Sequence, residues 1–462
     1  MQIERLNIFL GYEPIGSMLE NDALKKYLDK ASGIRYADIR TLGKNCVRAA
    51  LRNNSFEVSE FNDSIIGCRA LDRGYGISST NKTDTDIIET VVEQALGHAM
   101  SINSSVTLKQ VSPENGSYEH PVRKKPTIDD AKSLMMYVTD AVRNELHSIT
   151  KRIEIVLSYT EFNSGLVTSE GTDVKEAFST TDLKISLTIR TPSGMVEVKK
   201  VAGGKGGMEA IQHKDFESMI SDLVIMTRSS AGAKRFSPFE SGKKFRVILD
   251  SEAAGALARL IAHMLGADEF KSRIFDSLNI TEELEIVDDP LVPNAYGSFV
   301  WDDEGVRGRK KVLVSNGIVN LLHTRLTAQE KGIPGNAHGI SSVPKPSMSN
   351  VYINTSDWHL DEIIGDAKQG IYMKGVRRAT ANSSTGIIEL EPVIAFRITQ
   401  KEIKESVSNV KVIDSVQNIL EKIDAIGKLV SLIPSIEEGF NTSVGAPYLR
   451  IDGARCVYSA IQ

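Results

Sequence analysis

The sequence predicts an α+β protein of two domains, the first with a mostly antiparallel sheet and the second β-rich and barrel-like. Its 462 residues are too many for one ordinary hydrophobic core. Helix-like and strand-like patterns alternate in the first half, whereas strand and turn signals dominate the second. Residues 229–244 lie between them and carry four basic residues with little apolar pattern, which is typical of an inter-domain connection. We therefore expect domains at residues 1–232 and 233–462.

The first domain is expected to combine helices with β-hairpins. Apolar residues recur at helical spacing in four segments: 17–31, from Thr83 onward, 128–146 and 216–229. Six short runs have the composition of strands: 36–41, 47–51, 56–61, 65–71, 152–160 and 183–189. Asn53-Asn54 and Asn62-Asp63 separate the early runs as turns, so antiparallel hairpins are predicted.

The second domain is expected to hold two helices in a β-rich body. A strand at 245–249 leads directly into a helix at about 252–268. The strand at 312–314 is followed by Asn316-Gly317, a dipeptide that strongly favours a hairpin turn. A late helix is predicted at 415–426, with Ile423 on its apolar face.

Composition excludes several classes of protein. The net charge of −5 gives no general attraction to nucleic acid, and no apolar run is long enough to span a membrane. The N-terminal residues lack the layout of a signal peptide. The three cysteines lie far apart and form no CxxC pair, which argues against a disulfide framework or a zinc ribbon. We therefore expect a cytoplasmic protein that binds neither nucleic acid nor membranes.

The chain carries a series of short motifs in a specific order. The second half contains DDEGV at 302–306, VLVSNG at 312–317, LLHTR at 321–325, GNAH at 335–338, and KQGIY at 368–372 followed by GV at 375–376. The first half adds YADIR at 36–40, RGYG at 73–76 and SSTN at 78–81. Each motif is weak alone, but their order and spacing together resemble the TldD/PmbA family of zinc-peptidase-related proteins.

Catalytic members of that family carry HExxxH on a helix, and a cysteine near the C-terminus completes the zinc site. The metal activates a water molecule and the glutamate accepts its proton. In this sequence the resemblance places Ala258 and Arg259 at the first two motif positions and His263 at the second histidine. Ile426 stands where the cysteine would be. One ligand of three remains, and the positive charge of Arg259 would repel Zn²⁺.

The PmbA (TldE) branch of the family shows the same loss, and its members pair with TldD in a heteromeric peptidase. The resemblance therefore implies a non-catalytic subunit that holds no cofactor. It also implies a heterodimer with a zinc-bearing TldD-like partner, or a homodimer, and an unfolded peptide as substrate. We expect His263 to be a structural histidine, because it flanks an apolar helical stripe.

Four residues are candidates for contact with a peptide. Arg259 could hold a peptide carboxylate. Gly204 and Gly206 belong to the run 203–207, which fails the P-loop pattern and favours a flexible surface turn. If that turn is functional, its glycines would let a peptide approach closely. Asn336 of the GNAH motif is the fourth candidate.

Three alternatives remain open. The chain is a self-contained metallopeptidase if His263, His323, His338 and the acidic run 302–304 hold zinc, although that run is expected to be a solvated turn. It is a binding protein if it acts as a homodimer that holds peptides without hydrolysis. A role in DNA topology, associated with the family, is disfavoured by the negative net charge.

Overall fold

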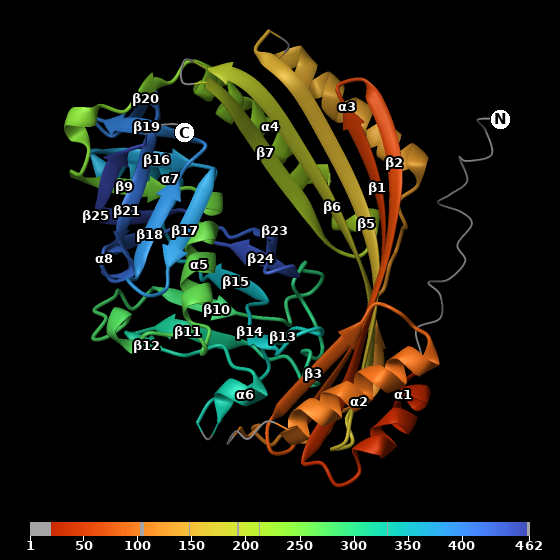
Figure 1. Cartoon of the computed structure of the whole chain (residues 1–462). Helices are drawn as coiled ribbons and strands as arrows, with labels where there is room; N and C mark the ends of the chain where they lie inside the picture. Colours follow the sequence, from red (N-terminus) through yellow and green to blue (C-terminus); the bar gives the residue numbers. More distant parts are fainter. Residues whose placement is uncertain are drawn as a thin grey trace, which may run out of the picture.

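The computed structural model describes residues 20–459 apart from 102–105, 147, 192–193, 212 and 330. The first half is built on a sheet of seven strands in the order β3-β2-β1-β5-β6-β4, with β7 also paired to β6 (Figure 1). These strands are β1 (Tyr36–Arg52), β2 (Ser55–Leu71), β3 (Tyr75–Thr80), β4 (Asn115–Glu119), β5 (Thr150–Thr168), β6 (Asp173–Thr191) and β7 (Gly194–Lys205). Only β4 runs parallel to its neighbour β6. The predicted mostly antiparallel sheet is therefore confirmed.

β1 and β2 are each 17 residues long, whereas two short strands were expected in place of each. Asn53-Asn54 forms the predicted turn, and Asn53 has a φ of 55°. The turn predicted at Asn62-Asp63 is wrong, because these residues lie within β2 opposite Asn45 and Lys44 of β1. Both are exposed, so the strand can carry polar side chains at this point.

Four helices accompany this sheet: α1 (Asn21–Leu28), α2 (Thr85–Ser101), α3 (Ile128–Leu146) and α4 (His213–Ala231). α2 packs against β2 and β3, and α3 and α4 cover the other end of the sheet. There the alternating apolar residues of β6, predicted from their period of two, are fully buried beneath the helices. No helix of the described part of the chain is both long and apolar enough to cross a membrane.

The second half contains two larger sheets and a two-stranded pair, β13-β14. The six-stranded sheet has the order β12-β11-β10-β15-β24-β23, and the ten-stranded sheet has the order β17-β18-β21-β25-β9-β16-β19-β20-β8, with β22 paired to β25. Their bounds are β8 (Lys234–Arg235), β9 (Lys244–Leu249), β10 (Glu285–Asp288), β11 (Lys311–Ser315), β12 (Ile318–Val319), β13 (Ala337–His338), β14 (Lys345–Pro346), β15 (Asn350–Ile353), β16 (Gln369–Lys374), β17 (Arg378–Asn382), β18 (Ile387–Glu391), β19 (Ile394–Thr399), β20 (Glu402–Ser408), β21 (Val410–Ser415), β22 (Ile423–Ile426), β23 (Leu432–Glu437), β24 (Phe440–Gly445) and β25 (Leu449–Tyr458).

The α+β class is confirmed, but neither large sheet closes into a barrel, because each ends in separate edge strands. The expected late helix is shorter: α8 (Val416–Glu421) ends early, and Ile423 lies in β22 opposite Ile451. Two helices that the sequence did not predict, α6 (Arg325–Ala328) and α7 (Leu360–Ala367), also belong to this half. The predicted domain boundary near residue 232 stays a prediction.

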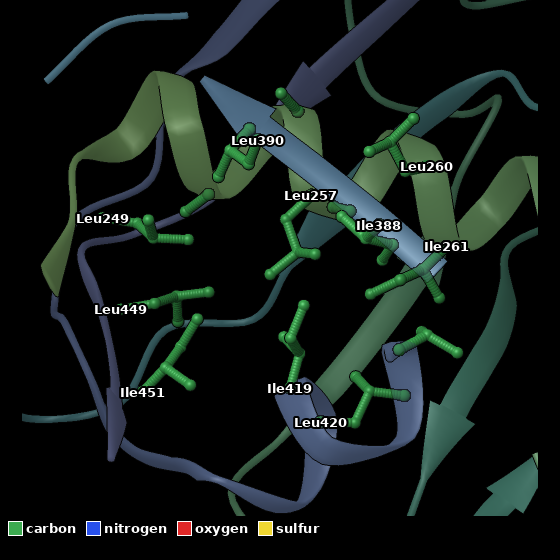
Figure 2. Close-up of a cluster of buried hydrophobic side chains, with 14 of the residues drawn as sticks. Leu249, Leu257, Leu260, Ile261, Ile388, Leu390, Ile419, Leu420, Leu449 and Ile451 are labelled. Atoms are coloured by element: carbon green, nitrogen blue, oxygen red, sulfur yellow. The ribbon is translucent and has the colours of Figure 1, made fainter. Parts of the chain in front are cut away.

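α5 (Ser251–Met264) lies between the two large sheets and is the most deeply buried helix of the second half (Figure 2). Its side chains Leu257, Leu260 and Ile261 face β18, α8 and β25, which supply further leucines and isoleucines to one hydrophobic cluster. Burial of each such side chain contributes about 1.5–3 kcal/mol. The helix is therefore held firmly, and the polar residues that it carries have fixed positions.

Candidate functional site

The start of α5 is fixed by carboxylates. Asp250 caps the helix, because its Oδ1 accepts a hydrogen bond from the Ala253 N–H at 2.8 Å. Its Oδ2 accepts another from the N–H of Gly375 at 2.8 Å. In the first turn, Glu252 pairs with Lys200 of β7 at 2.7 Å, so the sheet of the first half is tied to this helix. Burial raises the pKa of both carboxyl groups.

The other end of α5 carries an ionic group made by Arg259, His263 and Glu437. Arg259 and His263 are four residues apart and therefore share one face of the helix. Glu437, the last residue of β23, binds both: its Oε2 lies 2.7 Å from Arg259 Nη1 and its Oε1 3.0 Å from His263 Nδ1. The Glu437 side chain is only 9 % exposed. The contacts of Glu437 to Arg259 and His263 are charge-assisted hydrogen bonds in a partly buried environment, where such bonds are strong.

The bridge shifts the titration of its members. The hydrogen bond to Glu437 raises the pKa of His263, against the opposing effect of burial. Burial acts to raise the pKa of Glu437, but the His263 hydrogen bond and the Arg259 charge outweigh it and lower that pKa. At neutral pH the carboxylate is therefore ionised and holds two donors on α5.

The remaining motif positions do not join this group. Ala258 is fully buried in the hydrophobic cluster around α5. Ile426 is also buried, in β22 opposite Leu449, and is not among the residues around His263. A small pocket beside His263 has about 10 Å³ of free space, which is room for about one water molecule. Glu269 borders it, with Oε2 3.7 Å from His263 Nε2.

Comparison with known proteins places this arrangement in a family. Residues 241–457 match the family described as the PmbA/TldA metallopeptidase C-terminal domain. A metalloprotease of Methanocaldococcus jannaschii is 26 % identical over 461 residues, which covers 95 % of this chain and 98 % of the relative. The second half of the chain thus matches the C-terminal domain of the PmbA/TldD family, and the whole chain is similar to a metalloprotease.

Two further proteins bear on the fold and the metal. A zinc metalloprotease TldD homologue of Saccharolobus solfataricus is 24 % identical and covers 92 % of this chain and 98 % of its own length. The crystal structure of TldE from Thermococcus kodakarensis matches with a TM-score of 0.74 at 16 % identity, over 94 % of this chain and all of that one. One relative of this chain is thus named as a zinc metalloprotease, and the chain has the same fold as TldE.

The residues that the resemblance assigns to the zinc motif do not suit a zinc ion. Ala258 has no donor atom, Arg259 brings a positive charge, and His263 is already bound to Glu437. Within the residues that the structure describes, no three His, Cys, Asp or Glu side chains are grouped so that they could hold a metal ion.

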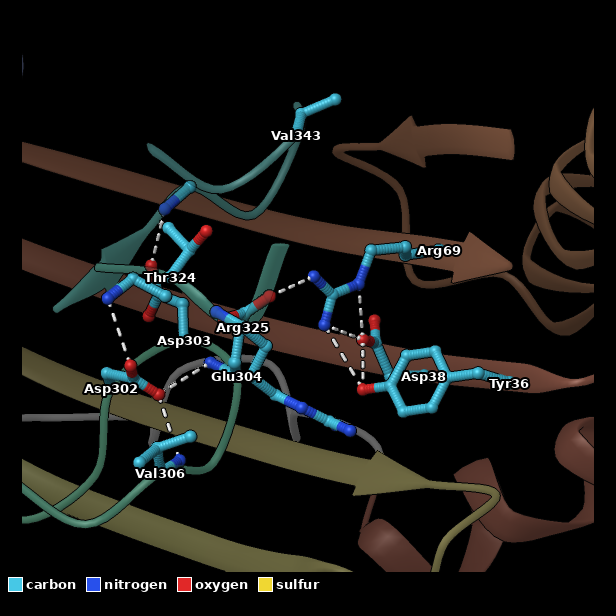
Figure 3. Close-up of polar contacts among 12 residues, drawn as sticks. Tyr36, Asp38, Arg69, Asp302, Asp303, Glu304, Val306, Thr324, Arg325 and Val343 are labelled. Atoms are coloured by element: carbon cyan, nitrogen blue, oxygen red, sulfur yellow. Dashed lines mark hydrogen bonds and ion pairs between the residues drawn. The ribbon is translucent and has the colours of Figure 1, made fainter. Parts of the chain in front are cut away.

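Asp302 and Glu304 of the acidic run 302–304 are buried, so the prediction of a solvated turn is wrong. Asp302 accepts hydrogen bonds at 2.9 Å from the backbone N–H groups of Glu304, Val306 and Ala337 (Figure 3). Burial, together with the charge of Glu304, raises the pKa of Asp302 to about 7. The Asp302 side chain thus stabilises the conformation of its own loop and does not face a ligand.

Glu304 joins the two halves of the chain. It pairs with Arg69 of β2 and accepts the N–H of Arg325, and both Glu304 and Arg69 side chains are 0 % exposed (Figure 3). Arg69 Nε also donates to Asp38 of β1 at 2.7 Å, and Tyr36 donates its hydroxyl to the same carboxylate at 2.7 Å. A desolvated charge needs such partners, so this network locks the second half onto the sheet.

The other histidines of the alternative zinc site lie apart from His263. His323 Nδ1 is 3.3 Å from the hydroxyl of Thr327, and His338 sits between two phenylalanine rings with Nδ1 3.9 Å from Asp303. Burial lowers the pKa of both histidines. Both are therefore neutral side chains in structural settings.

The glycine run 203–207 is largely buried, so the prediction of a flexible surface turn is wrong. Gly204 lies against the second half: a Cβ on it would come within 2.6 Å of the Asn294 carbonyl oxygen. Gly206 has a φ of 117°, a conformation that favours glycine. Asn336 is fully buried, donates to Asp288 at 2.7 Å and accepts a hydrogen bond from Lys311. Peptide contact by Gly204, Gly206 and Asn336 remains a prediction.

Glu437 is the member of the ionic group that the sequence did not reveal. It lies 178 residues after Arg259 and reaches α5 only because β23 and β24 form a hairpin whose turn begins at Glu438. No local pattern marks such a partner. An indirect signal existed: an arginine and a histidine one helical turn apart on a buried helix require an acidic neighbour.

Glu437→Gln is expected to lower the pKa of His263, as measured by NMR titration of the imidazole. The pKa is raised in the folded state, so the bridge stabilises the protein fully below the ordinary histidine pKa of about 6.5, and this contribution is lost as pH rises through the folded pKa. The same change at Glu269, at 3.7 Å, serves as the control and should have a smaller effect. Equal shifts from both variants would contradict the bridge.

Proposed function

We propose that this chain is the PmbA/TldE-type, metal-free subunit of a heteromeric zinc peptidase that processes unfolded peptides. A TldD-like partner supplies the zinc, the water and the general base. This chain forms part of the wall of the peptide-binding space and contributes no catalytic group. A cytoplasmic location belongs to the same proposal.

The salt bridge of Arg259 to Glu437 is the observation that carries this proposal. A general base must be an unprotonated acceptor near the metal-bound water. Here that position holds a guanidinium ion, which keeps its proton and already has a carboxylate partner. The charge of Arg259 is thus already paired with Glu437, which supports a structural role for this chain.

The comparisons support the rest of the proposal. The curated relatives are named as metalloproteases, and the whole-chain fold match is to TldE. A chain of this fold with one remaining ligand needs catalytic groups from elsewhere if it takes part in peptide hydrolysis. A heterodimer with a TldD-like chain provides them, which favours it over a homodimer.

Zinc analysis of the purified full chain tests this proposal. The chain alone is expected to carry far less than one zinc ion per molecule and to leave an unfolded protein such as β-casein intact. After co-expression with a TldD-like chain from the same genome, the complex is expected to carry about one zinc ion per heterodimer and to cleave β-casein.

Stoichiometric zinc in the isolated chain, lost on His263→Ala but kept on His98→Ala, would overturn the proposal. His98 is the matched control, because it is an exposed histidine on α2. Failure of the two chains to form a complex would also overturn it. Peptide binding by a homodimer that never hydrolyses, even beside the TldD-like chain, would favour the binding-protein alternative.

A further inference from the structure

A cleft of about 950 Å³ lies beside α6 in the second half of the chain. Residues 107–110, which precede β4 in the first half, form one wall, and residues of β12, α6 and the loops next to them form the other. α6 and β12 lie at the lower end of the second half (Figure 1). The volume is in the upper part of the range of small-molecule sites. We call this site the α6 cleft.

Arg325 holds the two walls of the α6 cleft together. Its carbonyl oxygen accepts the N–H of Lys109 at 2.9 Å, and its Nε donates to the carbonyl oxygen of Lys109 at 2.8 Å. The Arg325 side chain is itself buried, and its backbone N–H donates to Glu304 in the network of Figure 3. The walls therefore keep a fixed spacing, so the cleft is preformed.

Three side chains of the second half share one face of the cleft wall. Val319, Leu321 and His323 are alternate residues of the chain and all line the cleft. Leu322, between the last two, is buried in the hydrophobic cluster around α5. Val319 and Leu321 also pack against that cluster but remain partly accessible. This wall therefore offers an apolar surface with an imidazole at its end.

Positive charge predominates around the α6 cleft. Lys109 and Lys331 border it on opposite walls, and no aspartate or glutamate is among the described residues that line it. Lys331 is exposed and forms no ion pair with any residue that the structure describes. Burial, and after it the positive charge of Lys311, lowers the pKa of His323, so a further cation acts on this wall. Such a setting attracts an anionic group.

The rim of the α6 cleft is held in an unusual backbone conformation after α6. Gln329 has a φ of 42° and a ψ of −126°, which residues other than glycine rarely adopt. Gly332 lies so close to α6 that a Cβ on it would stand 2.8 Å from the carbonyl oxygen of Ala328 and from Cε1 of His323. Strained backbone of this kind is concentrated at functional sites.

We propose that the α6 cleft binds a small organic anion, in which a phosphate or carboxylate group is joined to an apolar body. The anionic group would lie near Lys331 and His323, and the apolar body would lie on Val319 and Leu321. The α6 cleft shares no lining residue with the pocket beside His263. The inference therefore goes beyond the proposed role in peptide hydrolysis and does not depend on it.

Binding of four small molecules to the full chain tests this site. Phenyl phosphate and benzoate carry an anionic group on a benzene ring, phenol has the ring without that group, and inorganic phosphate has the charge without the ring. In a ligand-observed NMR titration near pH 7.5, at least one ring anion is expected to bind about tenfold more tightly than phenol, the gain from one or two exposed ion pairs. It should also bind more tightly than inorganic phosphate, because its ring buries apolar surface. The tighter of the two ring anions identifies the anionic group.

Changes at Lys331 locate the bound anion. Lys331→Gln should weaken binding of the preferred ring anion about threefold, and Lys331→Glu about tenfold, while binding of phenol stays unchanged. Lys26→Gln and Lys26→Glu are the matched controls, because Lys26 is an exposed lysine of α1 outside the cleft. Both lysines are exposed, so none of these changes should disturb folding.

Four outcomes would overturn the site: phenol binding as tightly as both ring anions, inorganic phosphate binding as tightly as they do, equal effects at Lys331 and Lys26, or no binding of any probe. Salt gives a further check on the unaltered chain. About 0.5 M sodium chloride should reduce the preference for the ring anion over phenol, because it screens exposed charges. A preference that salt leaves unchanged would contradict the role of the lysine charges.

Discussion

Glu304→Ala is expected to lower the free energy of unfolding by about 3–5 kcal/mol, because it removes one of the two carboxylates that pair with the fully buried guanidinium of Arg69. Arg69 would keep Asp38 and the hydroxyl of Tyr36, but the backbone N–H of Arg325 would also lose its acceptor. Urea denaturation followed by circular dichroism measures the change.

Glu170→Ala is the matched control for this prediction. Glu170 also pairs with a buried arginine, Arg325, at 2.8 Å, but its own side chain is 31 % exposed, so water can replace it. A loss of about 1 kcal/mol or less is expected there. Similar effects of the two variants would show that burial does not set the strength of the Arg69–Glu304 pair.

Gly67→Ala is expected to destabilise the protein by about 3 kcal/mol through overpacking. Gly67 lies in β2, and a Cβ on it would stand 1.9 Å from the carbonyl oxygen of Ile340 in the second half. Backbone cannot give way as a flexible side chain does, so the two halves must separate slightly. Thermal unfolding by differential scanning calorimetry measures the change.

Gly116→Ala provides the comparison, since it is also a strand glycine at the contact between the halves. Its nearest neighbour would be the ring of Trp301 at 3.5 Å, an ordinary van der Waals contact. A change within about 0.5 kcal/mol is expected. If Gly67→Ala were as harmless as Gly116→Ala, the close approach of Ile340 to β2 would be wrong.

The fold class was predictable because periodicity reports burial directly. The alternating β6 residues and the helical stripes of α2 and α3 appear in the structure as the sequence indicated. Turn predictions were less reliable, because a segment with turn composition can continue as a strand when a neighbouring strand pairs with it. Asn62-Asp63 has turn composition, yet Asn45 and Lys44 pair with it across the hairpin. Ile423 has the spacing of a helical apolar residue, but in the structure it lies in β22 and pairs with Ile451 of β25.

The candidate site was predictable only as far as one helix carries it. Arg259 and His263 belong to one segment, so their shared face follows from helical geometry. Their common partner Glu437 depends on a hairpin far along the chain. The acidic run 302–304 was misjudged for the same reason, because its counter-charge Arg69 lies 235 residues earlier than Glu304. Pairing across such distances has no local signature.

The attachment of α5 at both ends decides which part of this region can move. Lys200 holds Glu252 at one end, and Glu437 holds Arg259 and His263 at the other, while apolar side chains fix the middle. The helix is therefore held rigidly in place, because sliding or rotating it would break ion pairs at both ends at once. β24 also packs directly against the helix and pairs with β15, so a ligand that competes for Glu437 would release Arg259 and His263 and leave both the helix and the hairpin in place.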